Sequence, residues 1–554
     1  MSEHPHDRRC SPYRPDATVE PMTRSIAWHD GMTGGDHGVG GSTGSVAAPS
    51  FGAGAPLGEV LPEQVKDLSS QFDGCLFQLR AARREIEEYA TYCARNDLLV
   101  DEPVLAHLVA ATQQVGMRVV RQQRALLAAS TTDAADLLGP SEAVLRFGLA
   151  TLAYVRHSLD WSAKSYGQSA QVQFFGTQSE SWPTIHYDRN GTHASVIRVE
   201  RQLLELLDLP PDRCGIGVTS SGMAAYTWIE AFLLRDRLRA GDTVLLAPYI
   251  YYETAQQLHA LPEVRAERAS GYAVEEIIAD VVRLRPKVIF VDPLANNVRQ
   301  RMLDLPELFR RLREVVTERC TVVVDGTMTG ASLQPTLFAS DDRLEVMYYE
   351  SCTKYLQLGM DFALAGLVVF PIELAERMDM LRRNTGLVLA RHNAELFPRY
   401  QVSLHRRRMR RIWANAERLA TLLHADPRVT SAGVVHHPVL PHHPDTRLAA
   451  GLPYGSGIVT FVYHDRPRND WDNLDAVVDQ ILVRARTRGT QVTKGVSFGY
   501  SVPRVWAQSV STTEEEYKYV PVPDDEPRFL RLYVGDRMHQ LDGLAKAIAE
   551  AIAG

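Results

Sequence analysis

A lysine stands between two apolar runs of the sequence, where a charged side chain is unexpected. Lys354 follows the run 344–349 and precedes the small, apolar run 363–369. Burial of an ammonium group is costly unless the group is paired or neutralised. A desolvated lysine with a lowered pKa is also a good Schiff-base nucleophile. Taken alone, the pentapeptide SCTKY at 351–355 also fits an exposed loop lysine, so the rest of the chain must decide.

Two hydroxyl side chains, Ser351 and Thr353, lie just before this lysine. Hydroxyl groups can hold a phosphate through hydrogen bonds. A reactive lysine beside a phosphate site is typical of a protein that carries pyridoxal 5′-phosphate (PLP). These residues therefore suggest PLP as the cofactor.

A second anion site is predicted at Ser221, Gly222 and Met223, between a strand-like run and a helical pattern. The free N–H groups and the dipole at a helix start attract a phosphate, and glycine lets the backbone approach it closely. A tight helix start with a capping serine gives the same pattern. For this segment alone, both interpretations stay open.

Two further residues follow predicted strands and could serve a planar cofactor. Asp325, after the run 321–324, could pair with a protonated pyridine nitrogen and keep the ring an electron sink. Tyr251, after the run 243–247, could stack on the ring, or act as an acid or base if its pKa is lowered. The alternatives are a turn aspartate and a core or interface aromatic.

These residues must be held by the elements around them, and the pattern of the chain indicates which. From about residue 176, short β-branched runs alternate with helical ones, which predicts a mostly parallel sheet covered by helices on both faces. Ligands bind at the carboxyl ends of such strands. The predicted strands are 215–219, 243–247, 288–291 and 321–324.

The 554-residue chain is predicted to have four parts. Residues 1–58 are rich in Gly, Pro, Ser and His, which indicates disorder. A helical extension is expected over 59–175, with its third helix at about 141–161, because apolar residues recur there every three or four positions. A PLP-binding large domain over 176–372 and a smaller C-terminal α/β domain over 373–554 complete the chain.

Composition excludes several classes of function. The net charge of −7 gives no reason to expect nucleic-acid or membrane binding. The six cysteines form no CxxC pair, which favours a reducing cytoplasm without a disulfide frame. No run is long enough for a membrane helix, and no signal peptide is visible. We therefore expect a cytoplasmic enzyme with no metal site.

The motifs, read in order, resemble the PLP-dependent enzymes of Cys/Met metabolism, the group of cystathionine γ-synthase, the cystathionine lyases and methionine γ-lyase. The similarity extends over about 180–554 and implies a fold type I PLP enzyme with an added N-terminal helical extension. The matching segments are 187–192, 221–225, 251–254, 293–304, 325–327, 351–355, 497–499 and 530–535.

The resemblance implies a role for each matched residue. Lys354 would hold PLP and move protons, Asp325 would pair with the pyridine nitrogen, and Tyr251 would stack on the ring. Arg531 would bind the substrate α-carboxylate with help from Ser497. The remaining cofactor contacts would be Ser221, Gly222, Met223, Ser351 and Thr353 at the phosphate, Tyr187 and Arg189 at the phosphate of a neighbouring subunit, and Asn296 or Asn297 at the ring hydroxyl. The active unit would then be a homodimer or homotetramer.

Departures from the family pattern leave the substrate open. Glu253 stands where the family has glycine, and Gly326 where it has asparagine. The basic run 405–411 is interpreted as a solvated helix face, with a phosphorylated or nucleotide-bearing substrate as the alternative. The paired histidines at 436–437 and 442–443 are interpreted as surface residues rather than metal ligands.

The residues leave three enzymatic functions and one non-catalytic alternative to compare. The first is elimination or replacement at Cβ or Cγ of a sulfur amino acid or an activated homoserine. The second is a biosynthetic γ-replacement on a methionine-derived donor such as S-adenosylmethionine. An aminotransferase needs the same lysine and aspartate but fits the motif series less well. A non-catalytic scaffold is disfavoured by the intact Lys354, Asp325 and Arg531.

Overall fold

The computed structural model describes residues 57–95, 97, 101–158, 189, 193–333, 340–509, 527–537 and 541–554. The expected disorder of the segment 1–58 therefore lies almost wholly outside the described residues, and so does Tyr187.

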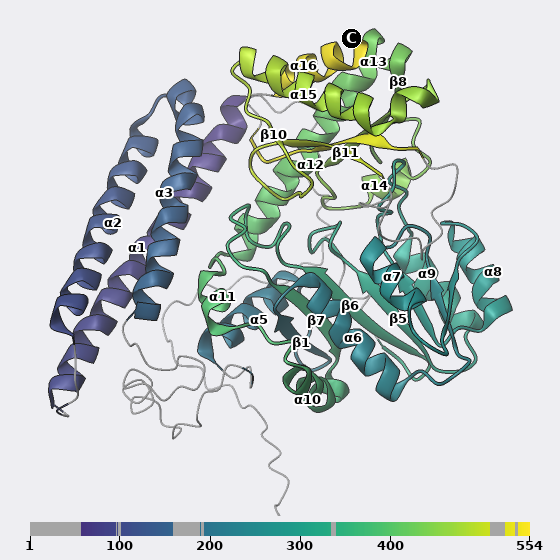
Figure 1. Ribbon diagram of the computed structural model, residues 1–554, viewed down its shortest axis with the longest axis horizontal. Helices are drawn as coiled ribbons and strands as arrows, with labels where there is room; N and C mark the ends of the chain where they lie inside the picture. Colours follow the sequence, from purple (N-terminus) through teal and green to yellow (C-terminus); the bar gives the residue numbers. More distant parts are fainter. Residues whose placement is uncertain are drawn as a thin grey trace, which may run out of the picture. The chain divides into compact units, whose positions relative to one another are not determined.

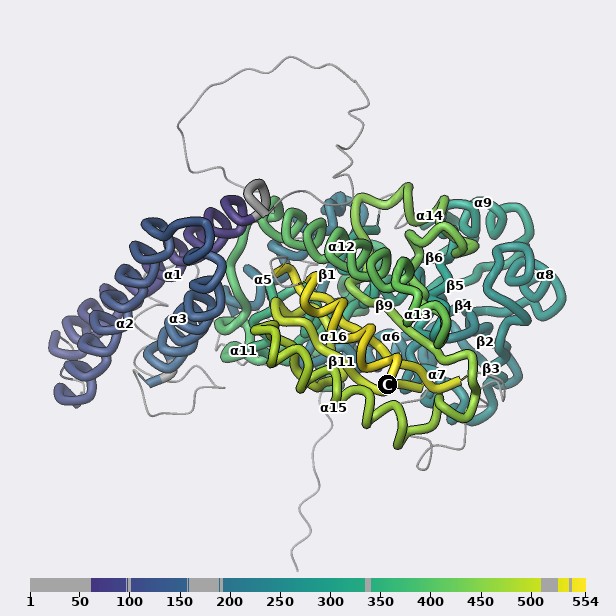
Figure 2. Tube along the Cα trace, turned by 90° about the horizontal axis from the view of Figure 1, so that it is seen from above, coloured from purple at the N-terminus to yellow at the C-terminus, as the bar shows by residue number. Residues whose placement is uncertain are grey.

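Three long helices form an N-terminal bundle: α1 (Leu57–Arg95), α2 (Glu102–Ala128) and α3 (Thr131–Ser158). They run side by side in both views (Figures 1 and 2). Asp101 caps α2 by accepting a hydrogen bond from the Val104 N–H (3.0 Å). The third helix begins at Thr131 rather than near residue 141 and continues through Pro140, because the turns before that proline bury Ala134 and Leu138 in the bundle core.

A seven-stranded sheet has the strand order β1-β7-β6-β5-β4-β2-β3. All strands run parallel except β7, which is antiparallel to both of its neighbours. The expectation of a mostly parallel sheet is confirmed; the short edge strand β3 was missed because its charged sequence lacks an apolar run. The strands are β1 (Cys214–Thr219), β2 (Thr243–Leu246), β3 (Arg265–Arg268), β4 (Val288–Val291), β5 (Cys320–Asp325), β6 (Leu344–Ser351) and β7 (Gly366–Pro371).

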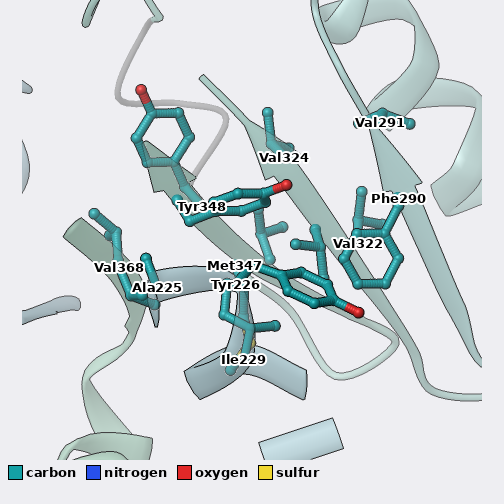
Figure 3. Close-up of a cluster of buried hydrophobic side chains, with 14 of the residues drawn as sticks. Ala225, Tyr226, Ile229, Phe290, Val291, Val322, Val324, Met347, Tyr348 and Val368 are labelled. Carbon is teal, nitrogen blue, oxygen red and sulfur yellow. The ribbon is translucent and has the colours of Figure 1, made fainter. Parts of the chain in front are cut away.

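Helix α6 (Gly222–Asp236) packs its apolar side on this sheet. Figure 3 shows Tyr226 and Ile229 of α6 beside Val322, Met347 and other strand residues. Burial of this apolar surface is the main source of stability for such a layer. The other helices of this part are α5 (Ala194–Leu206), α7 (Tyr252–His259), α8 (Val274–Leu284), α9 (Leu305–Val315), η4 (Ile372–Leu374), α10 (Ala375–Thr385) and α11 (Arg391–Leu396).

The C-terminal part is a five-stranded sheet, β10-β11-β12-β9-β8, with α15 and α16 packed on one face (Figure 1). Its central strand β12 carries Arg531, which pairs with β11 on one side and β9 on the other. The elements are α12 (Val402–Ala425), α13 (Pro427–Ala432), β8 (Gly433–His436), α14 (Thr446–Ala450), β9 (Ile458–Tyr463), η5 (Arg466–Asn469), α15 (Trp471–Thr487), β10 (Thr493–Lys494), β11 (Arg504–Gln508), β12 (Phe529–Tyr533) and α16 (Leu541–Ala553).

Within the described ranges, no helix has the length and apolar character that crossing a membrane requires.

The basic run at 405–411 is not a solvated helix face, contrary to expectation. It lies on α12, and Arg408 and Arg411 are 3% and 7% exposed. Arg411 donates to Asp67 of α1 (2.9 Å), and Arg408 pairs with Asp536 (3.5 Å). These two guanidinium groups are committed to internal ion pairs, which argues against a role in holding a phosphorylated substrate.

One histidine of each pair is buried, contrary to the expectation of surface residues, whereas His442 is exposed. His437 is fully buried beside Trp413, with ring centroids 4.9 Å apart, and burial lowers its pKa to about 3. His443 is 4% exposed, and its Nε2 lies 2.7 Å from the Arg299 carbonyl oxygen. They serve the packing of the Pro-rich turn. No cluster of three His, Cys, Asp or Glu side chains suited to a metal occurs in the described part of the chain.

Candidate active site

Five predicted site segments meet at one edge of the large sheet. Strands β1, β2, β4, β5 and β6 point the same way, so their carboxyl ends lie together. The chain leaves these ends at Ser221, Tyr251, Asn296, Asp325 and Lys354 respectively. The parallel sheet thus gathers residues that are far apart in the sequence.

Lys354 lies in the turn after β6, and it is not an exposed loop lysine. Its Nζ donates a hydrogen bond to Ser497 Oγ (2.9 Å) and lies 5.7 Å from the Phe498 ring centroid. Burial lowers the pKa of the Lys354 amine, and Arg504 lowers it further, while the carboxylates of Asp361 and Glu253 act in the opposite direction. A lysine with a lowered pKa can act as a nucleophile and a base near neutral pH.

A cradle of hydroxyl and backbone groups lies beside this lysine. Ser221 caps α6 by accepting from the Ala224 N–H (3.0 Å), and Ser351 Oγ is 2.9 Å from Thr353 Oγ1. A Cβ on Gly222 would lie 2.7 Å from Ser351 Cβ, so only glycine allows the helix start to reach the two hydroxyls. The capping serine and the anion site, left as alternatives by the sequence, are compatible here, and the half-buried Met223 follows them.

Asp325 ends β5 as a buried carboxyl group, 6% exposed. Its contacts within the described chain are to neutral donors, the backbone and hydroxyl of Thr327 and the hydroxyl of Tyr349. Burial raises its pKa. A buried carboxyl group in such surroundings is stabilised in its ionised form by a cation. The cradle, this carboxyl group and Lys354 together fit PLP, whose phosphate, pyridine nitrogen and aldehyde they match in chemistry.

Tyr251 precedes α7 and is 38% exposed. Partial burial of the side chain, together with the Glu253 carboxylate, raises the pKa of Tyr251. The condition set for a tyrosine base, a lowered pKa, is therefore not met. The hydroxyl keeps its proton at neutral pH and is suited to donate it.

The two candidate asparagines have different surroundings. Asn296 Oδ1 accepts a hydrogen bond from Arg531 Nη1 (2.8 Å). Asn297 is 2% exposed and accepts from the Gln300 N–H in its own turn. Arg531 is 4% exposed, and its Nε and Nη2 have no hydrogen-bond partner among the described residues. An unsatisfied buried guanidinium fits a carboxylate that binds in the site.

Several neighbours of these groups were not singled out from the sequence. Tyr349 Oη lies 3.2 Å from Thr254 Oγ1, and the Ser351 N–H donates to Thr327 Oγ1 (2.9 Å). Tyr349 thus supports Asp325, and Thr327 supports both Asp325 and the hydroxyl cradle. Thr327 stood beside Asp325 in the matched motif, but Tyr349 lies in an apolar strand pattern and gave no signal.

The structure does not place two of the predicted residues at this site. Tyr187 lies outside the described residues, and so do the residues on both sides of the exposed Arg189.

Comparison with known proteins gives a family match. A family model described as Cys/Met metabolism PLP-dependent enzyme matches residues 161–486, more than half of the chain. The bifunctional enzyme flvA of Aspergillus flavus is 32% identical over 394 residues, 70% of this chain and 45% of that enzyme. The chain thus spans less than half the length of this relative. Cystathionine beta-lyase of Neurospora crassa is 27% identical over 415 residues, 73% of this chain and 83% of that enzyme.

Solved structures share the fold. Cystathionine gamma synthase from Xanthomonas oryzae pv. oryzae, in complex with aminoacrylate and cysteine, has a TM-score of 0.54 at 21% identity, covering 68% of this chain and 89% of that one. The CalE6 cystathionine gamma lyase of Micromonospora echinospora has a TM-score of 0.53 at 26% identity, covering 68% and 91%.

Fold and site define a fold type I PLP enzyme. The chain belongs to the Cys/Met metabolism PLP-dependent enzyme family, and its cofactor is PLP.

Proposed function

We propose that this enzyme catalyses elimination or replacement at Cβ or Cγ of a sulfur amino acid or an activated homoserine. The observation that carries the proposal is that Lys354 lies at the same edge of the sheet as Arg531, whose guanidinium group could bind the carboxylate of a substrate. Lys354 Nζ is held by Ser497, while two nitrogens of Arg531 at the same edge of the sheet have no partner within the described ranges. An amino-acid substrate needs both a base at Cα and an anchor for its carboxylate.

The chemistry depends on what each residue would do. Bound PLP would supply an electron sink for negative charge at Cα. Asp325 would hold a proton on the pyridine nitrogen, and the hydroxyls of Ser351 and Thr353, with the start of α6, would bind the phosphate. Arg531 would fix the α-carboxylate and so direct the Cα–H bond toward Lys354.

Proton transfers would be carried by Lys354 and Tyr251. The lowered pKa of the lysine amine favours its action as a base at Cα and, for γ-chemistry, at Cβ. Ser497 Oγ, 2.9 Å from Nζ, would restrict the positions that the amine can take. Tyr251, protonated at neutral pH, would give its proton to the leaving group. With a substrate that has no leaving group at Cβ or Cγ, Tyr251 would have no leaving group to protonate.

The names of related proteins support this assignment: they include a cystathionine gamma synthase, a cystathionine gamma lyase and a cystathionine beta-lyase. We also propose that the active unit is a homodimer or homotetramer, with Tyr187 and Arg189 contributed to a neighbouring subunit's phosphate site. Cofactor-binding residues would then belong to the part 176–372, and Arg531 and Ser497 to the part 373–554.

The visible absorption of the purified full-length protein tests the proposal. We expect wild type to carry a visible PLP band that Lys354→Ala loses or shifts, and the exposed-lysine control Lys546→Ala to keep it unchanged. Cystathionine, methionine and an acylated homoserine are then assayed for keto-acid release and, with a thiol present, for replacement. A wild type that stays colourless with added PLP would contradict the assignment.

A second candidate is γ-replacement on a sulfonium donor such as S-adenosylmethionine. It is favoured by Glu253 and Asp361, the two carboxylates that act on Lys354, because a cationic leaving group would be attracted to them. Glu253→Gln should then slow consumption of S-adenosylmethionine more than that of an acylated homoserine. Equal slowing of both donors would count against the sulfonium.

A further inference from the structure

The turn that follows the cofactor lysine has an unusual backbone. Leu358, Gly359 and Asp361 all have positive φ angles, of 54°, 79° and 48°. Non-glycine residues in this region cost free energy and persist where surrounding contacts enforce them. Gln357 supplies part of that constraint from inside: its side chain bonds the Cys352 and Ala363 carbonyls (3.1 and 2.7 Å) and accepts from two N–H groups.

The helical bundle supplies the rest of the constraint. Met360, 4% exposed, is buried in the hydrophobic core of α1–α3, and Phe362 packs against the same core. Arg146 of α3 lies over the Phe362 ring, 5.2 Å from its centroid, and its Nη1 is 3.5 Å from the Gly359 carbonyl oxygen. Both neighbours of Asp361 in the sequence are therefore held by the bundle.

The opposite side of Lys354 is fixed through α12. Arg408 donates to the Gly499 carbonyl oxygen (2.8 Å), and a Cβ on Gly499 would lie 2.1 Å from the Lys354 carbonyl oxygen. A Cβ on Gly359 would lie 2.8 Å from Arg408 Nη2 and 3.3 Å from the Gly499 oxygen. The turn after Lys354 and the segment after Ser497 are thus in direct contact.

The carboxylate of Asp361 is exposed on this turn, and the Tyr500 hydroxyl that binds it also bonds Ser497, the hydrogen-bond partner of Lys354 Nζ. Tyr500 donates a hydrogen bond to Asp361 Oδ2, and the Arg504 guanidinium carbon lies 3.4 Å from the Tyr500 ring centroid. Among the described residues, the charged groups acting on Lys354 are Asp361 from the turn, Glu253 from α7 and Arg504 from β11. Moving Asp361 away would remove one of the two negative charges that stabilise the protonated amine.

We propose that the N-terminal bundle positions Asp361 against the cofactor lysine, with Arg146 and Met360 as positioning residues. The inference rests on Lys354 being the cofactor lysine of the proposed function, and it assigns the helical extension a part in tuning the active site. The bundle holds the turn, the turn sets the place of the carboxylate, and the carboxylate sets the pH at which Lys354 ionises.

The test is the pH titration of the visible absorption of bound PLP in the full-length holoenzyme. Asp361→Asn should lower the titration midpoint by about half a pH unit, because an opposite charge that stabilises the cation is removed. Arg146→Ala and Met360→Ala should lower it in the same direction. The double variant Arg146→Ala/Asp361→Asn should show no further shift, since both changes act through one carboxylate.

The matched control is Arg118→Ala, which removes a similar arginine–aromatic contact, to Phe147 (5.8 Å), that lies wholly within the bundle. Arg118→Ala should leave the titration midpoint unchanged. Arg146→Lys keeps a cation near Phe362, so its midpoint should lie between those of Arg146→Ala and wild type. The proposal would be overturned if Arg146→Ala and Met360→Ala had the wild-type titration midpoint while Asp361→Asn had a lower one. An unshifted Asp361→Asn would overturn it equally.

A second readout separates this proposal from the proposed function. Competitive acetylation of Lys354 against pH, in the full-length apoprotein and followed by peptide mass spectrometry, reports the pKa of the lysine without cofactor or substrate. The midpoint should fall in Arg146→Ala as in Asp361→Asn. If Lys354→Ala kept a normal PLP band, the proposed function would fail, while the acetylation profile would still show whether the bundle controls Lys354.

Discussion

Arg531 and Asn296 come from different parts of the chain and meet at the edge of the large sheet. Arg531 Nη1 donates to Asn296 Oδ1 at 2.8 Å, across 235 positions of sequence. The neutral asparagine uses one donor of the guanidinium and leaves its charge unbalanced, with Nε and Nη2 unpartnered among the described residues. The pair therefore holds the arginine in a fixed orientation while keeping its charge for a ligand.

Removal of this guanidinium should weaken substrate binding. Arg531→Ala should lower kcat/KM for the amino-acid substrate by roughly 30- to 5000-fold, the range for losing a buried charged partner of about 2–5 kcal/mol. Arg531→Lys should recover only part of this, because an ammonium cannot form the same fork. Steady-state kinetics measures both. An unchanged kcat/KM in Arg531→Ala would mean that the α-carboxylate binds elsewhere.

The close approach of Gly222 to Ser351 predicts a loss of cofactor. A Cβ at Gly222 would lie 2.7 Å from Ser351 Cβ, so Gly222→Ala should cost about 1–3 kcal/mol in PLP binding, or roughly 5- to 150-fold in Kd. Gly116→Ala in α2 is the control, because no atom of the described residues lies within 4 Å of its added Cβ. Helix propensity should raise the stability of that control by about 0.5–1 kcal/mol. Equal PLP affinity in both variants would argue against the cradle.

Because Glu350 is buried, we expect the free energy of unfolding to fall as the pH rises. Glu350 is fully buried in β6, and burial raises its pKa from 4.5 to about 8. Between these values the folded protein holds a proton that the unfolded chain has released, so stability falls as the pH rises from 4.5 through about 8 and is level beyond. Glu350→Gln removes this contribution, so its stability relative to wild type should rise by roughly 5 kcal/mol between about pH 4 and about pH 9.

Urea unfolding of wild type and Glu350→Gln at about pH 4 and about pH 9 gives the comparison. Other buried carboxyl groups, such as Asp325, also contribute to the wild-type slope, so the difference between the two proteins is the quantity to follow. The control Glu376→Gln changes an exposed position of α10. A constant difference between wild type and Glu350→Gln at both pH values would contradict the prediction.

Asp67 should be required for docking of α1. Its carboxylate, 3% exposed, lies 2.5 Å from Arg407 Nη2 and 2.9 Å from Arg411 Nη1. Asp67→Asn leaves the buried Arg411 with Glu63 (2.8 Å) as its remaining close partner and should cost about 1–3 kcal/mol of unfolding free energy. Glu87→Gln breaks the exposed Arg83–Glu87 pair and should cost under about 1 kcal/mol. Chemical denaturation distinguishes the two, and similar costs would show that the Asp67 pair is not critical.

Elements whose signals are local were predictable. The strands β4 and β5 appear as short β-branched runs, and α8 begins and ends where its apolar spacing does. Asp325 and Lys354 were predicted as site residues because each follows a predicted strand, and the structure places both at the same edge of the sheet. Tyr349 was missed because its hydroxyl partners Thr254 across 95 positions, which no local pattern records.

Charge and burial show where sequence reasoning failed. Arg411 and His437 were assigned to the surface because an isolated buried charge or imidazole is costly. Arg411 is buried because Asp67 lies beside it from 344 positions earlier, and His437 because Trp413 covers its ring. The compensating partner decides burial, and it is supplied only by the fold.

The sequence by itself determined the family, the cofactor and the parallel architecture, since these depend on short motifs and on the periodicity of side chains along one segment. Tertiary structure alone decided that two donors of Arg531 have no partner in the described part of the chain, that Asn296 rather than Asn297 contacts this arginine, and that the bundle holds the turn carrying Asp361. The reason is physical: hydrogen bonds and ion pairs act over a few ångströms of space, and folding, not sequence distance, brings such groups together.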